Sequence, residues 1–177
     1  MRCFKMNFIA KLLIVLSTGF CPFLAYGSVH LEKPKDFHPS IEVSGCFIEY
    51  QDKFLMLHRQ DYKPEGNQWG VPGGKIDAGE SPLDAVIREI HEETHFDISQ
   101  DKIDYFGEVY IKSPKGDKDL TFHMFRCKAS EQPGGVKISF KEHKGFTWVT
   151  PEDALQMNLM ADEDACIKLM YDEVNES

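Results

Sequence analysis

The stretch that decides the fold is GGKIDAGESPLDAVIREIHEETHF, residues 73–96. Within it, Ser81 is a good helix N-cap and Pro82 suits the first helical position. Apolar residues then recur at positions 83, 86, 87 and 90, which is the spacing of one face of an amphipathic helix. The pattern predicts a helix that begins near Ser81 and ends around Thr94 or His95.

Strand-like runs of alternating apolar and polar residues lie on both sides of this helix. They cover residues 42–50 and 53–58 before it, and residues 103–112, 120–128, 136–140 and 145–149 after it. A turn is predicted at residues 51–52, and an interruption of regular secondary structure is predicted at residues 72–74. Two further helices are predicted, one capped by Thr150 and one over residues 165–174. The order of elements predicts an α+β fold with a mixed central sheet flanked by helices.

Three glutamates lie along the predicted helix at positions i, i+3 and i+4. Glu89, Glu92 and Glu93 therefore share one side, about a third of a turn from the apolar face. Clustered carboxylates repel one another, and a hard divalent cation with oxygen ligands relieves that repulsion. Mg²⁺ fits best and Mn²⁺ can substitute. Taken alone, however, such a cluster is more often an ordinary solvated face of a helix.

The residues around the glutamates resemble the Nudix box. Gly74 is followed after five residues by Glu80, and after seven more by Arg88-Glu89-Ile90-x-Glu92-Glu93, in a loop–helix–loop signature over residues 74–96. The preceding residues 69–74, WGVPGG, are similar to the lead-in of many members. The resemblance covers residues 41–175 and implies the α/β/α sandwich of that family.

One position departs from the family pattern. The glycine that follows the paired glutamates is His95 in this chain. A left-handed residue at a helix end costs a side-chain-bearing residue about 1 kcal/mol, and histidine tolerates it better than most. Two interpretations stay open: a tolerated change of the helix cap, or a histidine that reaches the site and tunes it.

The resemblance implies roles for individual residues. Glu89, Glu92, Glu93 and the backbone carbonyl of Gly74 would bind Mg²⁺. Arg88 would orient the glutamates, and Glu80 would brace the loop or reach a metal through water. The general base is not placed uniformly in the family; Glu93, Glu142 and Glu163 are the candidates. Glu163 can alternatively contact the nucleobase, and both Glu142 and Glu163 can be solvated surface residues.

Substrate-binding residues are less well marked than the metal ligands. Arg59 and Lys75 are the basic residues closest to the motif, and either can hold a phosphate or remain a surface charge. Trp69 and Phe125 can stack on a nucleobase or belong to the core. The loops at residues 60–67, 113–118 and 129–135 are expected to select the substrate.

The function implied by the resemblance is that of a Mg²⁺-dependent pyrophosphohydrolase. It would cleave a phosphoanhydride bond in nucleoside triphosphates or nucleoside diphosphate-linked compounds by metal-activated water. The alternative is a catalytically silent sensor of a nucleotide or of ADP-ribose. The expected partner is a small nucleotide, and a homodimer is possible because dimers are common among the proteins it resembles.

The N-terminal segment differs in composition from the rest of the chain. Residues 1–27 carry basic residues near the start, an apolar stretch at 12–24 and small residues at 25–27, which predicts a signal peptide and export to the periplasm or medium. An over-long gene start, and then a cytoplasmic protein, or an uncleaved anchor are the alternatives. Residues 28–40 are predicted to form a polar linker or an irregular lead-in.

Charge and cysteine content narrow the classes of partner. Residues 1–27 carry three basic residues and no acidic one, so removing them shifts the formal net charge from −9 to −12. A nucleic-acid-binding surface is therefore not expected. Cys46, Cys127 and Cys166 fit no zinc pattern, and either buried thiols or one disulfide is consistent with their spacing.

Overall fold

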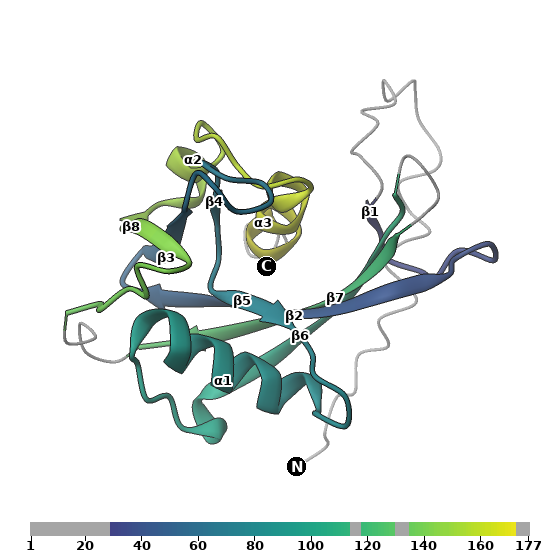
Figure 1. Ribbon diagram of the computed structural model, residues 1–177, viewed down its shortest axis with the longest axis horizontal. Coiled ribbons are helices and arrows are strands. Elements are labelled where there is room, and N and C mark those ends of the chain that lie inside the picture. Colours follow the sequence, from purple (N-terminus) through teal and green to yellow (C-terminus); the bar gives the residue numbers. More distant parts are fainter. Residues whose placement is uncertain (1–28, 114–117, 130–134, 173–177) are drawn as a thin grey trace, which may run out of the picture.

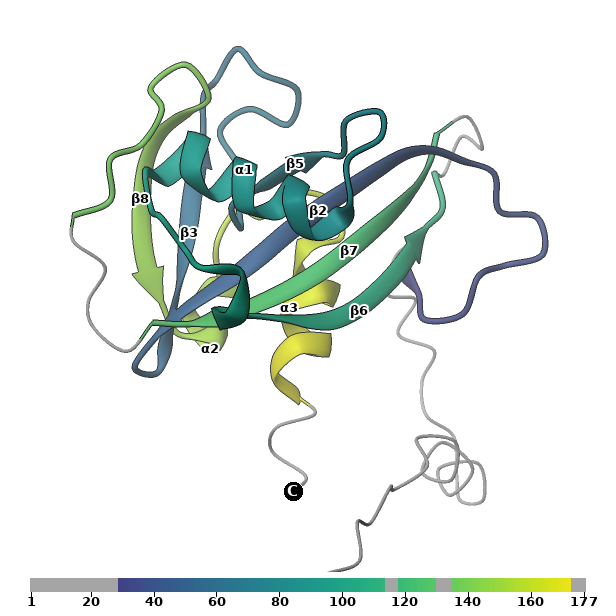
Figure 2. The same cartoon turned by 90° about the horizontal axis from the view of Figure 1, so that it is seen from below.

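The computed structural model describes residues 29–113, 118–129 and 135–172. The predicted signal peptide at residues 1–27 lies outside the described residues, as do parts of the loops predicted at 113–118 and 129–135. Helix α1 (Pro82–Thr94) covers one face of a mixed sheet, while α2 (Pro151–Ala154) and α3 (Glu163–Asp172) lie on the other (Figures 1 and 2). The predicted α+β architecture is confirmed.

The sheet has eight strands and is built around β2. The strands are β1 (Val29–His30), β2 (Pro39–Tyr50), β3 (Lys53–Arg59), β4 (Trp69–Gly70), β5 (Gly73–Lys75), β6 (Ile103–Ile111), β7 (Asp119–Lys128) and β8 (His143–Val149). Their order is β1-β6-β7-β2-β3-β4, with β5 paired to β2 and β8 paired to β3. Among the pairs of described strands, β2 and β7 are parallel and the others are antiparallel, so the sheet is mixed.

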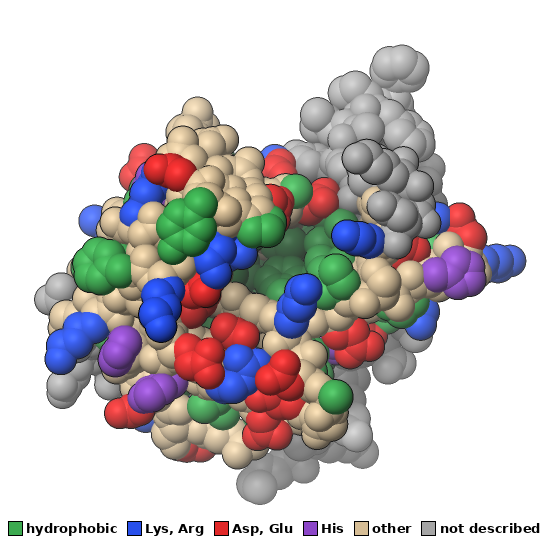
Figure 3. Space-filling model, viewed as in Figure 1, with side chains coloured by type: hydrophobic (Ala, Val, Ile, Leu, Met, Phe, Trp, Pro, Cys, Tyr) green, Lys and Arg blue, Asp and Glu red, His purple; other side chains and the backbone are tan. Residues whose placement is uncertain are grey.

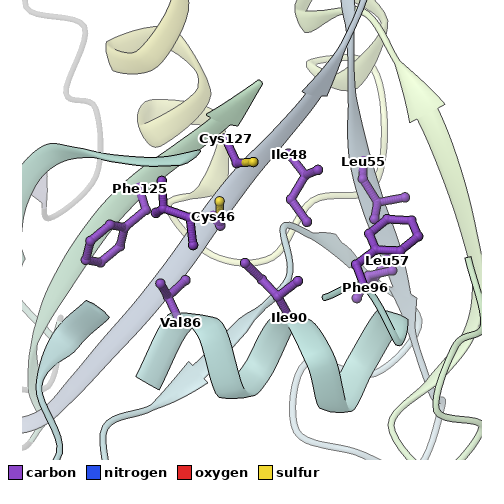
Figure 4. Close-up of a cluster of buried hydrophobic side chains, with 10 residues drawn as sticks. Cys46, Ile48, Leu55, Leu57, Val86, Ile90, Phe96, Phe125 and Cys127 are labelled. Carbon is purple, nitrogen blue, oxygen red and sulfur yellow. The ribbon is translucent and has the colours of Figure 1, made fainter. Parts of the chain in front are cut away.

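Strand β2 is buried on both faces, because a helix covers each side of the sheet there. Cys46 and Ile48 pack toward α1, where they meet Val86 and Ile90 (Figure 4). Phe47 points to the opposite side and joins the cluster beneath α3. A strand buried on both faces reads as an apolar run rather than as an alternation. Each such fully buried side chain stabilises the fold by about 1.5–3 kcal/mol.

The helix ends follow the capping signals in the sequence. The hydroxyl of Ser81 accepts a hydrogen bond from the backbone N–H of Asp84 at 3.1 Å, so α1 begins at Pro82 as predicted. Thr150 caps α2 in the same way, by accepting from the N–H of Asp153. Helix α3 starts at Glu163, two residues earlier than predicted.

Three local predictions were wrong. In the lead-in at 28–40, Val29–His30 pairs with β6 and Phe37 is buried against Tyr110. Residues 73–75 are not a break but strand β5, paired with β2. Residues 136–140 form no strand, because the N–H groups at 137 and 139 donate to the carbonyls of Thr94 and Glu93 at the end of α1.

The described part of the chain contains no disulfide among its cysteines. Cys46, Cys127 and Cys166 are all free and buried, which favours the buried-thiol interpretation. Within residues 29–113, 118–129 and 135–172, no helix combines the length and apolar character needed to cross a bilayer.

Candidate active site at the contact between α1 and β5

Arg88 ties helix α1 to the loop that precedes it. Its Nε and Nη2 each donate to one carboxylate oxygen of Glu80, both at 2.9 Å, and Nη2 also donates to the carbonyl of Lys75 at 3.0 Å. This two-pronged hydrogen bond lowers the pKa of Glu80. A third nitrogen, Nη1, donates to Oε1 of Glu89 at 2.7 Å. Arg88 therefore connects Glu80 in the loop before α1 to Glu89 on the helix.

The carboxylate of Glu89 rests directly on Gly74. A Cβ added at Gly74 would lie 2.4 Å from Oε1 of Glu89, far inside van der Waals contact. Glycine at this position of β5 therefore allows the carboxylate to approach the strand backbone. Burial raises the pKa of Glu89, and the positive charge of Arg88 opposes that shift.

Glu93 lies one turn further along α1 and is buried, with 5% of its surface exposed. Its Oε2 accepts a hydrogen bond from the backbone N–H of Gly73 at 2.9 Å. Loss of hydration on burial raises the pKa of Glu93 to about 8. Glu89 and Glu93 thus meet the two consecutive glycines of β5, Gly74 and Gly73.

Glu92 differs from the other two glutamates. Its side chain is 58% exposed and its Oε2 lies 3.7 Å from Nη1 of Arg88. The three glutamates therefore lie on one side of the helix, as their spacing predicted, but they differ in burial. Glu93 is buried, Glu89 is half-buried and Glu92 is exposed. In the described part of the chain, no three acidic, histidine or cysteine side chains already surround a common point as a metal-ligand set.

The donor set nevertheless suits a hard divalent cation. Glu89 and Glu93 supply oxygens only, and the proximity of Glu89 raises the pKa of Glu93. Hard cations such as Mg²⁺ take oxygen ligands and offset that repulsion. Figure 3 shows acidic side chains grouped around a basic one over α1, beside a hollow with a hydrophobic floor.

His143 also contacts Glu93. The sequence did not predict a role for this residue. It lies in β8, is 5% exposed, and places Nε2 at 3.6 Å from Oε1 of Glu93. Burial, and then the positive charge of Arg59, lower the pKa of His143 to about 4, so the imidazole is neutral at physiological pH. No periodic pattern in the sequence points to His143. The one hint of a role in the site is its position next to Glu142, a candidate base.

The two remaining candidate bases lie in different environments. Glu142 forms an ion pair with Lys63, whose Nζ lies 2.5 Å from its Oε1. Glu163 is buried at the start of α3, where it accepts a hydrogen bond from the N–H of Val71 at 3.4 Å. Burial raises the pKa of Glu163 to about 7. Segment 69–75 therefore meets Glu163 at one end and Glu89 and Glu93 at the other.

The candidate substrate-binding residues also differ in burial and in contacts. Arg59 is half-buried, and its Nε donates to the carbonyl of Pro64 at 2.8 Å. Its charge lowers the pKa of Glu93, so it lies within electrostatic range of the site. Lys75 is exposed. Trp69 stacks on His58, with ring centroids 4.2 Å apart. Phe125 is a core residue.

His95 caps the C-terminal end of α1. Its backbone is left-handed, with φ 58° and ψ 27°. The ring is exposed, and Nδ1 makes a hydrogen bond of 2.8 Å to the carbonyl of Lys137. The structure therefore favours the interpretation of His95 as a changed helix cap.

Comparison with known proteins agrees with this geometry. A family model described as NUDIX domain matches residues 39–170. A MutT-like protein of Streptomyces ambofaciens is 31% identical over 64% of this chain and 66% of its own length. An uncharacterized Nudix hydrolase, YvcI, of Bacillus subtilis is 32% identical over 60% of this chain. The chain thus spans slightly less than two thirds of these relatives, 66% and 63% of their lengths.

More complete matches come from a third relative and from solved structures. CTP pyrophosphohydrolase of Escherichia coli is 27% identical over 67% of this chain and 82% of its own. The crystal structure of a MutT protein from Methanosarcina mazei superposes with a TM-score of 0.64 at 27% identity, covering 78% of this chain and 97% of that one. The NUDIX domain of Shewanella oneidensis NrtR, complexed with ADP ribose, gives a TM-score of 0.65 at 23% identity over 81% and 94% of the two chains. These likenesses confirm the predicted α/β/α sandwich.

Proposed function

Because the chain belongs to the Nudix family, we propose that it is a Mg²⁺-dependent pyrophosphohydrolase. Its substrates are nucleoside triphosphates or nucleoside diphosphate-linked compounds, in which it cleaves a phosphoanhydride bond. The observation that carries the proposal is the approach of Glu89 and Glu93 to the paired glycines of β5. A purely solvated acidic face has no need to bury a carboxylate against a glycine backbone.

We propose the following roles for the residues of the site. Glu89, Glu93 and the carbonyl of Gly74 would hold the cation, with Glu92 turning inward to complete the set. Bound Mg²⁺ would neutralise phosphate charge and lower the pKa of water. Arg88 and Glu80 fix the helix to the β5–α1 loop, so the ligand oxygens keep their position as substrate enters.

Relatives support the substrate class only at the level of the diphosphate bond. Proteins similar to this chain are named as a CTP pyrophosphohydrolase, an RNA pyrophosphohydrolase and a dihydroneopterin triphosphate diphosphatase. Their substrates share a terminal polyphosphate and differ in the group attached to it. We therefore expect this chain to recognise the polyphosphate through the α1–β5 contact and the attached group elsewhere.

Glu163 is the residue we propose for contact with the attached group. It is buried beside the segment Trp69–Val71, at the end of segment 69–75 away from the glutamates. With a pKa of about 7, its carboxyl can donate a hydrogen bond below neutral pH and only accept one above it. We expect Glu163→Gln to raise KM more than it lowers kcat and to flatten the pH dependence of KM near pH 7.

The primary test is hydrolysis of a panel of nucleoside triphosphates, nucleotide sugars, ADP-ribose and dinucleoside polyphosphates with Mg²⁺. Glu93→Gln removes a proposed ligand, and Glu152→Gln makes the same change at an exposed position on α2. Cleavage by the parent and Glu152→Gln, but not by Glu93→Gln, supports the proposal. Tight nucleotide binding without cleavage by any of the three proteins would instead identify a sensor.

We further propose that the enzyme acts outside the cytoplasm. The support is the composition of residues 1–27, with basic residues before an apolar stretch and small residues at its end. Cell fractionation followed by N-terminal sequencing tests this. Recovery of an intact N-terminus from cytosol would refute export.

A further inference from the structure

His143 reaches the proposed metal ligand Glu93 from a separate part of the chain. Nε2 of the imidazole lies 3.6 Å from Oε1 of Glu93, and each of the two side chains is 7% exposed. Strand β8, which carries His143, passes beside α1 (Figures 1 and 2). The contact therefore joins the glutamate helix to the sheet at a point from which most water is excluded.

Backbone hydrogen bonds hold the two residues in this arrangement. The N–H of Ser139 donates to the carbonyl of Glu93 at 3.2 Å, and the N–H of His143 donates to the carbonyl of Ser139 at 2.9 Å. The side-chain amide of Gln60 donates to the carbonyl of His143 at 3.4 Å. A side chain whose own position is fixed by packing and hydrogen bonds can orient its neighbour.

The surroundings of the ring favour one tautomer of His143. A pKa of about 4 keeps the imidazole neutral at physiological pH, with one N–H and one lone pair. Among the described residues, Nδ1 is buried without a hydrogen-bond partner. A proton on Nδ1 would therefore be a buried, unsatisfied donor, and the Nε2 lone pair would face the carboxylate. A proton on Nε2 avoids both costs, because it points at Oε1 of Glu93.

The ionised carboxylate of Glu93 benefits from a second donor. Its Oε2 accepts from the N–H of Gly73 at 2.9 Å, while its Oε1 faces Nε2 of His143. Each carboxylate oxygen can accept two bonds, so one donor on each restrains the group and leaves room for a cation. The separation of 3.6 Å is slightly longer than a hydrogen bond, as contacts in ligand-free sites often are, and a small rotation of Glu93 closes it.

Given the metal-dependent function proposed above, we infer that His143 is a positioning residue of the metal site. Its Nε2–H donates to Oε1 of Glu93 and holds that carboxylate in the orientation in which it binds a divalent cation. Glu93 is then held from two sides, by β5 through Gly73 and by β8 through His143. An outer partner of this kind typically strengthens metal binding by ~10–100-fold.

The test compares two amide variants of the full-length chain. The side-chain nitrogen of glutamine can take the place of Nε2, whereas that of asparagine can take only the place of Nδ1. His143→Gln therefore keeps the donor to Glu93, and His143→Asn loses it. Calorimetric titration with Mn²⁺ alone should show ~10–100-fold weaker binding by His143→Asn and nearly parental binding by His143→Gln. His38→Asn, at an exposed histidine before β2, is the control and should bind as the parent chain does.

The possible results separate a role of His143 from the proposed function itself. An equal loss of affinity in both amide variants would show that the imidazole only fills space. Equal affinity of the parent chain and His143→Asn would show that it contributes nothing to metal binding. Either result overturns the inference while leaving the proposed function in place. Absence of Mn²⁺ binding by the parent chain would refute the proposed function and, with it, this role of His143.

A second measurement needs no metal. In EDTA at about pH 9.5, above the pKa of about 8 of Glu93, the carboxyl is ionised. Long-range proton–nitrogen correlation spectra of the histidine rings should then show His143 protonated on Nε2. The signals of His143 are identified by their loss in His143→Asn. A proton on Nδ1 would overturn the inference even if the chain binds Mn²⁺.

Discussion

Replacing Glu93 with glutamine should change how stability depends on pH. The carboxyl has a pKa of about 8 in the folded chain, against an ordinary value of 4.5. Between these two values the folded chain keeps a proton that the unfolded chain has released. The stabilisation is thus fully present below pH 4.5 and is lost as pH rises toward 8, by about 1.36 kcal/mol per pH unit.

The magnitude follows from the width of that window. A carboxyl that is 5% exposed loses roughly 3–5 kcal/mol of stabilisation across it in the absence of metal. Glutamine has nearly the same shape and no proton to lose, so Glu93→Gln should gain on the parent chain as pH rises. Glu163, whose pKa is also shifted, titrates in both proteins, so its contribution cancels in the difference between them.

The assay is urea unfolding followed by tryptophan fluorescence at pH values from 5 to 9 in EDTA. The free energy of unfolding of Glu93→Gln minus that of the parent chain is the quantity of interest, with Glu152→Gln as the surface control. The difference should rise steadily from pH 5 and level off above about pH 8. A difference that is constant over this range would show that the Glu93 carboxyl is hydrated and would refute the argument from burial.

Three further outcomes follow from the geometry of the site. Gly74→Ala should abolish hydrolysis and destabilise the fold by about 1–3 kcal/mol, because its Cβ would lie 2.4 Å from Oε1 of Glu89, whereas Gly135→Ala meets open space and should be neutral in activity and urea unfolding assays. Arg88→Lys keeps the charge but loses the two-pronged bond to Glu80, so kcat should fall at least ~10-fold with a smaller change in KM in steady-state assays. Chelation with EDTA should stop hydrolysis, and added Mg²⁺ or Mn²⁺ should restore it in the same assay.

Local signals in the sequence were enough for most of the fold. Ser81 and Pro82 placed the start of α1, and the apolar positions such as Val86 and Ile90 are buried as their spacing predicted. The failures came where a distant segment supplied hydrogen bonds. Residues 136–140 alternate like a strand, but their N–H groups bond to the end of α1 instead. No property of those five residues reveals that partner.

The sequence pointed to the candidate residues on α1 but did not show what surrounds their side chains. Spacing and resemblance identified Glu89, Glu92, Glu93 and Arg88 together, because all lie on one helix. His143 comes from β8, fifty residues beyond Glu93 in the chain, and only the sheet brings the two within 3.6 Å. Helical periodicity gives the angle of a side chain around its axis and says nothing about what faces it.

Because periodicity does not reveal the environment of a side chain, the sequence did not predict that the three glutamates of α1 differ in burial. Gly74 presents only backbone to Glu89 on α1, and the N–H of Gly73 donates to Glu93, so the helix lies close to β5 and Glu93 is buried while Glu92 stays solvated. A carboxylate that has lost its hydration and gained only one backbone hydrogen bond is under-coordinated when ionised. A cation at that point would replace the lost hydration. The loss of hydration on burial therefore explains both the raised pKa of metal-free Glu93 and its proposed role as a metal ligand. Metal affinity should accordingly rise with pH up to about 8, as the Glu93 proton becomes easier to displace.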